Sequence, residues 1–299
     1  MAQAHILIMA GGVGSRLFPL STPEHPKQFI DILETGKTLI QMTYERFLAV
    51  NPQARFWILT SEKYIHFIHE QLPGIPDEQI LAEPMARNTA PCISYACRKI
   101  AAKYPDATVV ITPSDAYVPD HSAFAATIHT AMDYAARQDA LLCIGIQPTR
   151  PDTGYGYIAQ GAQMPALAGN GGTGQGGNAG SGVFKVQAFK EKPDEETAKR
   201  YLAEGGYFWN AGIFVWNVRS IEAELAAHAP GIEALISKVE PHFYTPSEQS
   251  VLEEYFPQCE KISIDYAVME KSSIVYMVPG LWEWSDLGSF AAIDAAKRK

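Results

Sequence analysis

Residues 5–17 read HILIMAGGVGSRL, a run of mainly apolar side chains that ends directly in a glycine-rich turn. A continuous apolar run of this kind is typical of a strand that is covered on both faces. Glycines at the carboxyl end of such a strand let backbone N–H groups approach a phosphate closely. The stretch therefore predicts the first strand of an α/β sheet, followed by a phosphate-binding turn.

The turn matches neither of two well-known phosphate loops. The dinucleotide fingerprint GxGxxG needs a third glycine where this chain has Leu17, and a P-loop needs a lysine that does not follow Gly14. What remains is a glycine turn with Arg16, whose guanidinium can bind phosphate oxygens in a bidentate manner. Taken alone, such a turn is about as often structural as functional.

Further apolar runs alternate with amphipathic stretches through the first half of the chain. We expect strands at 5–10, 55–60, 79–83, 108–112 and 140–146. We expect helices between them at 38–50, 61–72, 88–104 and 122–138. Alternation at this spacing indicates right-handed βαβ units. The sequence therefore predicts an α/β, Rossmann-like fold with a mostly parallel central sheet and helices on both faces.

The pattern changes after residue 150. Strands are expected at 183–189, 213–218 and 273–278, with helices at 194–204, between 220 and 256, and at 289–297. We interpret 1–299 as a single domain in which 151–299 elaborate the sheet begun by 1–150. Residues 169–182 (GNGGTGQGGNAGSG) contain 8 of the 23 glycines and no Lys or Arg, so they predict a flexible glycine-rich loop.

Composition excludes several classes of protein. The 299 residues carry a net charge of −9, which argues against a nucleic-acid partner. No apolar run approaches the roughly 20 residues of a membrane-spanning helix, so no membrane partner is expected and the predicted location is cytoplasmic. Four cysteines without a CxxC pair predict neither a disulfide framework nor a structural zinc site.

The loop after the first strand continues as GGVGSRLFPLSTPEHPKQF over residues 11–29. Its three prolines forbid a regular helix, so the segment must wrap as a stiff loop that can hold Lys27 over the glycine turn. This stretch resembles the signature of the sugar-1-phosphate nucleotidyltransferases. Its PKQF ending resembles the mannose-1-phosphate guanylyltransferase branch of that family.

The resemblance implies a fold, a reaction and roles for the loop. In such a nucleotidyltransferase, a sugar 1-phosphate attacks the α-phosphate of a nucleoside triphosphate in line, and pyrophosphate leaves. For this branch the implied substrates are GTP and α-D-mannose 1-phosphate. Arg16 is expected to hold the leaving pyrophosphate, and Lys27 to stabilise charge near the α-phosphate. The nucleotide is expected to contact the turn at Gly11, Gly12, Gly14 and Ser15.

Two carboxylates follow predicted strands. Asp115 comes directly after the apolar run TVVIT, where a carboxylate is well placed for a hard cation. In the family this residue binds Mg²⁺; the next position is usually His but here is Ala116, which leaves open the contact that His would make. Asp286 lies in WEWSDLG, which resembles the family's Trp-x-Asp-x-Gly element. We expect both to hold Mg²⁺, the alternative for Asp286 being a cap on the last helix.

A nucleoside element is expected at residues 83–91, EPMARNTAP, which resembles the family's Asn-Thr-Ala-Pro motif. Asn88 either binds the nucleotide or simply caps the helix that starts there, and the residues do not decide between the two. Ser114, which precedes Asp115, is a further expected nucleotide contact.

Three motifs in the second half resemble the family's sugar-binding elements. They are TGYGYI at 153–158, FKEKP at 189–193 and WNAGIF at 209–214. The resemblance implies that the Gly156 backbone meets the sugar hydroxyls and that Glu191 accepts hydrogen bonds from them. It also implies that Lys192 pairs with the sugar phosphate and that Asn210 contacts the sugar. Residues 1–150 would then be the nucleotide-binding half and 151–299 the sugar-binding elaboration.

Two alternatives remain open. The first is a pyrophosphorylase for another pair of nucleotide and sugar 1-phosphate, and the second is a catalytically silent sugar-nucleotide sensor. The presence of both predicted metal carboxylates together with Arg16 and Lys27 favours the enzyme. A homodimer is a possible assembly.

Overall fold

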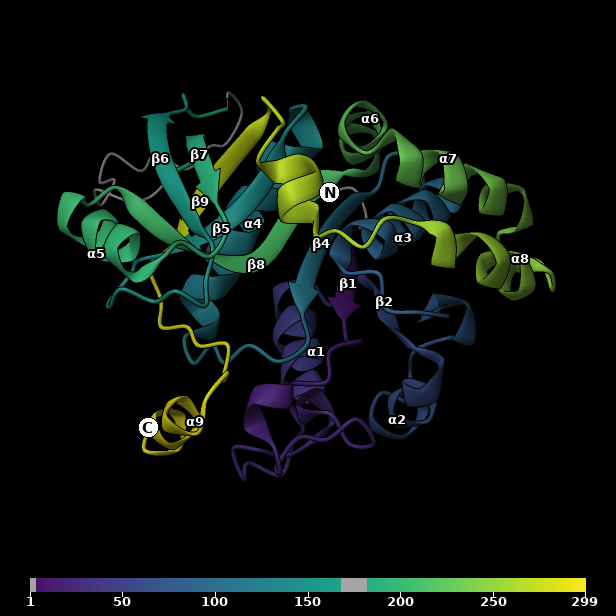
Figure 1. Cartoon of the computed structure of the whole chain (residues 1–299), viewed down its shortest axis with the longest axis horizontal. Coiled ribbons are helices and arrows are strands. Elements are labelled where there is room, and N and C mark those ends of the chain that lie inside the picture. The colour runs from purple at the N-terminus through teal and green to yellow at the C-terminus, as the bar shows by residue number, and fades with distance from the viewer. Residues whose placement is uncertain (1–3, 168–181) are drawn as a thin grey trace.

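The computed structural model describes residues 4–167 and 182–299. The predicted glycine-rich loop therefore lies outside the described residues, apart from its last glycine. The described strands form one nine-stranded sheet in the order β3-β2-β1-β4-β8-β5-β9-β7-β6 (Figure 1). The strands are β1 (Ala4–Met9), β2 (Arg55–Ser61), β3 (Ile80–Glu83), β4 (Thr108–Pro113), β5 (Leu141–Ile146), β6 (Tyr157–Gln163), β7 (Phe184–Lys190), β8 (Tyr207–Asn217) and β9 (Val275–Gly280).

The first four strands of the sheet run in one direction. β1 pairs in parallel with both β2 and β4, and β2 pairs in parallel with β3. β8 enters between β4 and β5 and is antiparallel to both, whereas β9 is parallel to β5. The two strands at the far edge, β6 and β7, are antiparallel to their neighbours. The α/β class is confirmed, and the parallel part of this mixed sheet is its β3-β2-β1-β4 half together with the β5–β9 pair.

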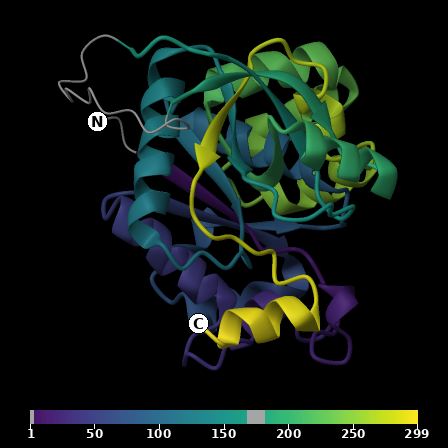
Figure 2. The same ribbon diagram turned by 90° about the vertical axis from the view of Figure 1, so that its left-hand side faces the viewer.

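Side chains of β1 alternate between the two faces of the sheet. Ile6 and Ile8 belong to the core on the face covered by α1, α2, α4 and α5, whereas Leu7 belongs to the core on the face covered by α3, α6, α7 and α8. Figures 1 and 2 show these helices on both sides of the strands. The helices are α1 (Leu39–Val50), α2 (Ile65–Gln71), α3 (Thr89–Lys103), α4 (His121–Arg137), α5 (Glu195–Glu204), α6 (Val218–His228), α7 (Pro230–Val239), α8 (Glu248–Tyr255) and α9 (Phe290–Lys297).

Three features of the second half were not expected. Residues 157–163 form the strand β6, and β8 begins at Tyr207, six residues before the predicted strand. A short π-helix, Asp265–Met269, lies between α8 and β9. β6 and β8 extend the sheet begun by the first half, so strands from both halves belong to one sheet.

The last helix returns to the first loop. α9 lies beside the N-terminal loop in Figure 2, and Ile293 and Ala296 pack there against Leu17 and Leu39. Leu287 is fully buried in the same small cluster. This packing holds the segment that carries Asp286 against the loop that carries Arg16. In the parts of the chain that the structure describes, no helix combines the length and apolar character needed to cross a membrane.

Candidate functional site

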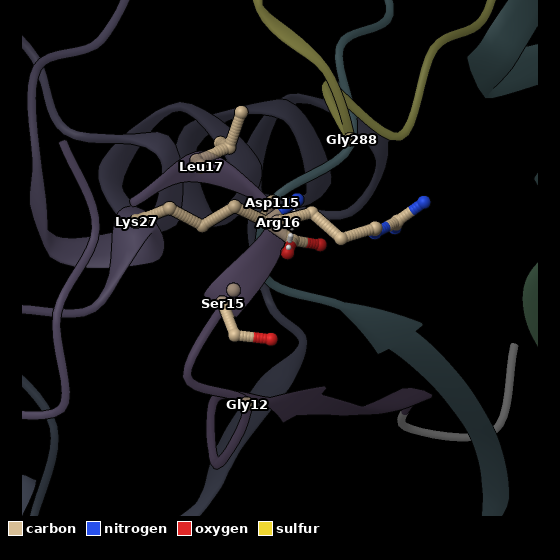
Figure 3. Close-up of a pocket in the computed structure, with 8 residues that line it drawn as sticks. Gly12, Ser15, Arg16, Leu17, Lys27, Asp115 and Gly288 are labelled. Carbon is tan, nitrogen blue, oxygen red and sulfur yellow. Dashed lines mark ion pairs between the residues drawn. The ribbon is translucent and has the colours of Figure 1, made fainter. Parts of the chain in front are cut away.

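A cavity of about 310 Å³ opens beyond the carboxyl ends of β1 and β4 (Figure 3). The end of parallel strands is where α/β sheets bind their ligands. Residues from the first loop, from the end of β4 and from the segment before α9 surround this cavity. They are Gly12, Gly14, Ser15, Arg16, Leu17, Lys27, Asp115 and Gly288.

The glycine turn packs closely against the side chain of Lys27. Gly14 has a φ of 67°, a left-handed conformation that favours glycine, and a Cβ there would lie 3.0 Å from Lys27 Cγ. Ser21 Oγ donates to the Val13 carbonyl at 2.6 Å and accepts from the Lys27 N–H at 2.9 Å. The proline-rich loop therefore folds back and places Lys27 beside the turn.

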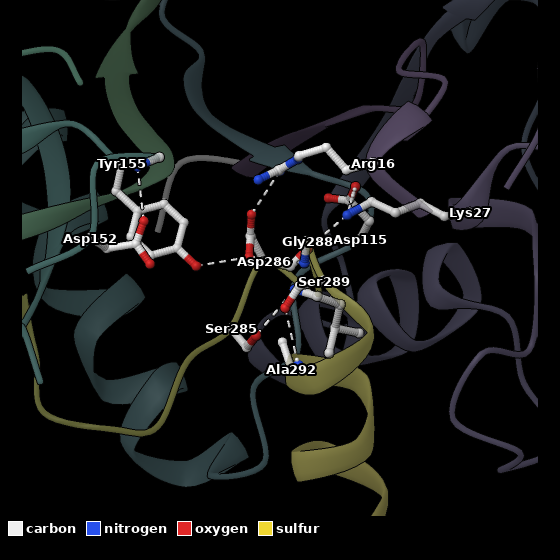
Figure 4. Close-up of polar contacts among 12 residues, drawn as sticks. Arg16, Lys27, Asp115, Asp152, Tyr155, Ser285, Asp286, Gly288, Ser289 and Ala292 are labelled. Carbon is white, nitrogen blue, oxygen red and sulfur yellow. Dashed lines mark hydrogen bonds and ion pairs between the residues drawn. The ribbon is translucent and has the colours of Figure 1, made fainter. Parts of the chain in front are cut away.

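Lys27 contacts the carboxylate of Asp115 and the main-chain carbonyl of Asp286, the two residues predicted to bind the metal. Its Nζ lies 2.9 Å from Asp115 Oδ2 and donates to the Asp286 carbonyl at 2.7 Å (Figure 4). Its side chain is only 8% exposed. An ammonium held this way loses little conformational entropy when a phosphate arrives, and it keeps a donor beyond the two contacts described.

Asp286 contacts both the first loop and the segment that precedes β6. Its Oδ2 lies 3.0 Å from Arg16 Nη2, and its Oδ1 accepts from the Tyr155 hydroxyl at 2.8 Å. The same Oδ1 accepts from the Gly288 N–H. The helix cap of α9 is Ser289, whose side chain accepts from the Ala292 N–H, so Asp286 does not have the capping role (Figure 4).

The residues around the cavity suit a Mg²⁺ ion bound together with phosphates. Mg²⁺ is usually held by one or two carboxylates, with phosphate oxygens and water as the other ligands. The Asp115 carboxylate pairs with Lys27, whose Nζ also contacts the Asp286 main-chain carbonyl. The Asp286 carboxylate pairs with Arg16, and the side chains of Asp115 and Asp286 are each 24% exposed. The described residues contain no group of three or more His, Cys, Asp or Glu side chains placed to enclose a metal. The donor set therefore fits an ion that shares its coordination with substrate, and not a closed protein cage.

Side chains of helix α1 hold the backbone on both sides of Asp115 by hydrogen bonds. Thr43 Oγ1 donates to the Ser114 carbonyl at 3.1 Å, and Arg46 Nη2 donates to the Ala116 carbonyl at 2.8 Å. Burial lowers the pKa of Arg46 to about 10. Thr43 and Arg46 were not singled out in the sequence, because a basic residue on an amphipathic helix usually indicates a solvated face.

A second group of predicted residues gathers where β6, β7 and β8 meet. A Cβ on Gly156 would lie 2.6 Å from Glu191 Oε2, so a side chain there would displace this carboxylate. Lys192 forms an ion pair with Glu191. The Asn210 N–H donates to the Gly156 carbonyl at 2.8 Å, and Asn210 Nδ2 donates to Asp265 Oδ1 at 3.0 Å. Asp265 belongs to no motif recognised in the sequence.

Asn88 lies outside both groups. It is exposed at the start of α3, and its Oδ1 accepts from the Thr89 N–H at 2.9 Å. It thus has the capping role, and the predicted nucleotide contact stays a prediction. Gly11 and Ser114 also lie off the cavity wall. A Cβ on Gly11 would be 3.9 Å from Glu83 Oε1, which places that carboxylate beside the glycine turn.

Glu83 is a further titratable group near the turn. It is the last residue of β3, and burial raises its pKa to about 7, partly offset by a hydrogen bond with Cys92. Buried groups with shifted pKa values are common at functional sites. Glu83 is the first residue of the predicted nucleoside element 83–91, and its place at a strand end is the signal that could have singled it out within that element.

Replacing Gly288 with alanine is expected to lower kcat/KM about 10²-fold, because misplacement of about 1 Å in an active site has effects of this size. A Cβ there would lie 2.5 Å from Asp286 Oδ2 and 2.8 Å from Arg16 Nη2, so the pair must move. Steady-state kinetics on Gly288→Ala checks this. Gly231→Ala in α7, where a Cβ meets nothing within 4 Å, is the matched control. Equal activity of the two variants would contradict the prediction.

Comparison with known sequences places the chain among nucleotidyl transferases. The profile of the nucleotidyl transferase family matches residues 5–299. The chain is 36% identical over 292 residues to the alginate biosynthesis protein AlgA of Pseudomonas aeruginosa, covering 96% of this chain and 57% of that protein. It is 36% identical over 303 residues to a mannose-1-phosphate guanylyltransferase of Escherichia coli, covering 98% and 60% respectively. The chain thus spans a little over half the length of these curated relatives.

Solved structures show the same fold. A Thermus thermophilus protein described as a mannose-1-phosphate geranyltransferase superposes with a TM-score of 0.83 at 28% identity, over all of this chain and 80% of that one. A UDP-glucose pyrophosphorylase in complex with UDP-glucose superposes with a TM-score of 0.59 at 14% identity, over all of this chain and 98% of that one. The second likeness extends to the fold alone.

Proposed function

We propose that this chain, which belongs to the nucleotidyl transferase family, joins α-D-mannose 1-phosphate and GTP to give GDP-mannose and pyrophosphate. One observation carries the proposal. The Lys27 ammonium lies beside the glycine turn and within 2.9 Å of both Asp115 Oδ2 and the Asp286 carbonyl. A fixed cation, a glycine turn and two carboxylates suited to Mg²⁺ are the parts that transfer between phosphates needs.

Positioning and charge neutralisation perform the reaction. The sugar-phosphate oxygen attacks the α-phosphorus of GTP, and the bond from that phosphorus to the bridging oxygen of pyrophosphate breaks. Lys27 donates toward the charge that develops on the α-phosphate oxygens, while Arg16 holds the departing pyrophosphate. No covalent bond to the protein is needed, because holding two phosphates in line supplies a large part of the barrier reduction.

Mg²⁺ would be held by Asp115 and Asp286, and when bound it would neutralise phosphate charge as a Lewis acid. Both carboxylates are already paired with cations of the chain, Lys27 and Arg16. Arg16 is 65% exposed on its side chain, so it is free to turn from Asp286 toward an incoming triphosphate. The negative charge of the carboxylates is thus kept balanced before substrates arrive.

The second group of residues would hold the sugar phosphate. Glu191 offers acceptors for sugar hydroxyls, and Lys192, which is 60% exposed on its side chain, can release Glu191 and pair with the phosphate. Tyr155 and its bond to Asp286 join this group to the first. Several relatives carry the name mannose-1-phosphate guanylyltransferase, at 34% to 36% identity, which favours mannose 1-phosphate and GTP over other pairs.

Glu83 gives a chemical reason to favour guanine. The Watson–Crick edge of guanine presents two adjacent N–H donors, and an ionised carboxylate is a pure acceptor with two oxygens. Glu83 lies beside Gly11 at the end of β3, near the start of α3. We assign it to the base, with the rest of the element 83–91 around the nucleoside.

Glu83→Gln is expected to raise KM for GTP about 10- to 100-fold, the effect of losing a hydrogen bond to a charged group. KM for the sugar phosphate should not change. Because burial raises the pKa of Glu83 to about 7, the wild-type carboxyl gains a proton as the pH falls through 7. KM for GTP should then rise between pH 8 and pH 6 in the wild type and stay level in the variant. Glu78→Gln, on an exposed residue nearby, is the control.

The substrate assignment is tested by measuring pyrophosphate release with GTP, ATP, UTP, CTP and dTTP against a panel of sugar 1-phosphates, with and without Mg²⁺. The proposal expects the highest kcat/KM for GTP with mannose 1-phosphate, and none without a divalent cation. A higher value for another pair would reassign the substrates. No release from any pair would favour the sugar-nucleotide sensor.

A further inference from the structure

Asp265 begins the π-helix Asp265–Met269. Just before it, the Ile264 N–H donates to Thr89 Oγ1 at 2.8 Å, which ties the segment to the start of α3. The Glu270 N–H closes the π-turn by donating to the Asp265 carbonyl at 2.9 Å. Single π-turns are rare and occur frequently at functional sites. The backbone therefore presents the Asp265 side chain in one place.

The amide of Asn210 has a single orientation because of Asp265. Asn210 Nδ2 donates to Asp265 Oδ1 at 3.0 Å, and Asn210 Oδ1 accepts from the Gly212 N–H at 3.0 Å. A flipped amide would face its NH₂ toward the Gly212 N–H and its oxygen toward a carboxylate, and both contacts are repulsive. The fixed amide keeps one N–H and one acceptor site for a ligand.

The stability of the fold alone does not explain an acidic side chain at position 265. Burial is the main cause that raises its pKa to about 6, and the nearby Glu191 carboxylate raises it further. Lys192 and the Ser263 hydroxyl act in the opposite direction, and Cys143 of β5 is the other titratable group whose pKa responds to it. Two acidic groups held together and partly shielded from water cost free energy that an apolar residue would not. Such an arrangement is typical of a binding site.

We propose that Asp265 is the positioning residue of the sugar-phosphate site, fixing the Asn210 amide so that its spare donor and acceptor meet the sugar hydroxyls. The inference rests on the proposed function, because it assigns Asp265 to the sugar and not to the nucleotide. Asp265 acts through Asn210, which in turn is held to the Gly156 carbonyl. The chain therefore uses a partly buried carboxylate to orient one amide.

Three variants test the proposal by steady-state kinetics. Asp265→Ala is expected to raise KM for the sugar 1-phosphate about 10-fold or more, because loss of the charge-assisted bond from Asn210 to Asp265 leaves the Asn210 amide without a fixed orientation toward the sugar. KM for GTP should stay within about twofold of wild type, because Asn210 is assigned to the sugar and not to the nucleotide. Asp265→Asn, whose amide oxygen still accepts from Asn210, should recover most of that loss. Glu260→Ala, an exposed acid on the same connecting segment, should behave as wild type.

Two further measurements separate positioning from a general structural role. Calorimetry should show that Asp265→Ala weakens binding of GDP-mannose while leaving the affinity for GTP unchanged. In addition, Asn210→Ala combined with Asp265→Ala should be no worse than Asn210→Ala alone, since a residue that acts only through another gives non-additive effects.

The outcomes distinguish failure of this inference from failure of the proposed function. An unchanged KM for the sugar 1-phosphate in Asp265→Ala overturns the inference, as does a parallel loss of GTP binding with a lowered Tm. Additive effects in the double variant overturn it as well. A wild-type protein that turns over no pair and binds no GDP-mannose overturns the proposed function, and the inference with it.

Discussion

Lys27→Ala is expected to lower kcat about 10²- to 10³-fold, the usual loss when one fixed donor to a developing charge is removed. KM for either substrate should change by less than about threefold, because the Lys27 contact strengthens as charge builds on the α-phosphate and adds little to ground-state binding. The side chain is 8% exposed and already held between Asp115 and Asp286, so it is positioned before substrates bind. Steady-state kinetics with both substrates varied gives the two constants separately.

Lys37→Ala provides the control for this prediction. Lys37 lies ten residues further along the chain, pairs with Glu45 at 2.6 Å and has a half-exposed side chain. Its removal should leave kcat unchanged. Near-normal turnover in Lys27→Ala would remove Lys27 from the catalytic machinery, and a rise in KM with unchanged kcat would make it a binding residue only.

Asp115→Asn and Asp286→Asn are expected to lower kcat more than about 10²-fold each, since metal neutralisation of phosphate charge supplies several kcal/mol. Each substitution keeps the shape of the side chain and removes one negative charge from the pair that would hold Mg²⁺. The Mg²⁺ concentration that gives half-maximal rate should rise in both variants. Chelation of divalent cations should abolish wild-type activity, and added Mg²⁺ should restore it.

Asp106→Asn is the control for the two proposed metal carboxylates. Asp106 is exposed, pairs with Arg219 and precedes β4, at the opposite end of that strand from Asp115 and outside the cavity lining. A wild-type Mg²⁺ dependence in Asp115→Asn would show that this carboxylate is not a ligand. The Lys27–Asp115 pair would then serve only to hold the ammonium.

Much of the fold could be predicted from local patterns. The predicted strand at 108–112 corresponds to β4, Thr108–Pro113, and the predicted helix at 88–104 corresponds to α3, Thr89–Lys103. Both segments have an unbroken apolar or amphipathic period, which is the signal that single sequences carry best.

The antiparallel part of the sheet could not be predicted in this way. β6 is interrupted by a glycine and has three polar or exposed positions at its end, so its period is weak. β8 contains Gly212 at a φ of 70°, which reads as a break and not as the middle of a strand. β8 lies between β4 and β5 because it pairs with β4, a strand more than 100 residues earlier in the chain. No local sequence pattern predicts such a pairing.

The site was predictable where its residues form motifs. Arg16, Lys27 and Asp115 were singled out from motifs, and the structure brings them to one cavity. Asp265 and Arg46 were missed because their roles arise only from tertiary contacts, with Asn210 and the Ala116 carbonyl respectively. An isolated acid or guanidinium in a sequence has no feature that distinguishes these positions from solvated ones. Tyr155 lies within the TGYGYI motif, but its bond to Asp286 depends on the tertiary fold.

The central claim is that one site joins the two substrates directly, and a single-turnover experiment tests it. Enzyme in excess over GTP is mixed with Mg²⁺ and saturating mannose 1-phosphate, and GDP-mannose and pyrophosphate are quantified over time. The account predicts that both products appear at the same rate, one for one, and that GTP with Mg²⁺ alone releases no pyrophosphate. Release of pyrophosphate from GTP alone, or pyrophosphate without GDP-mannose, would contradict it.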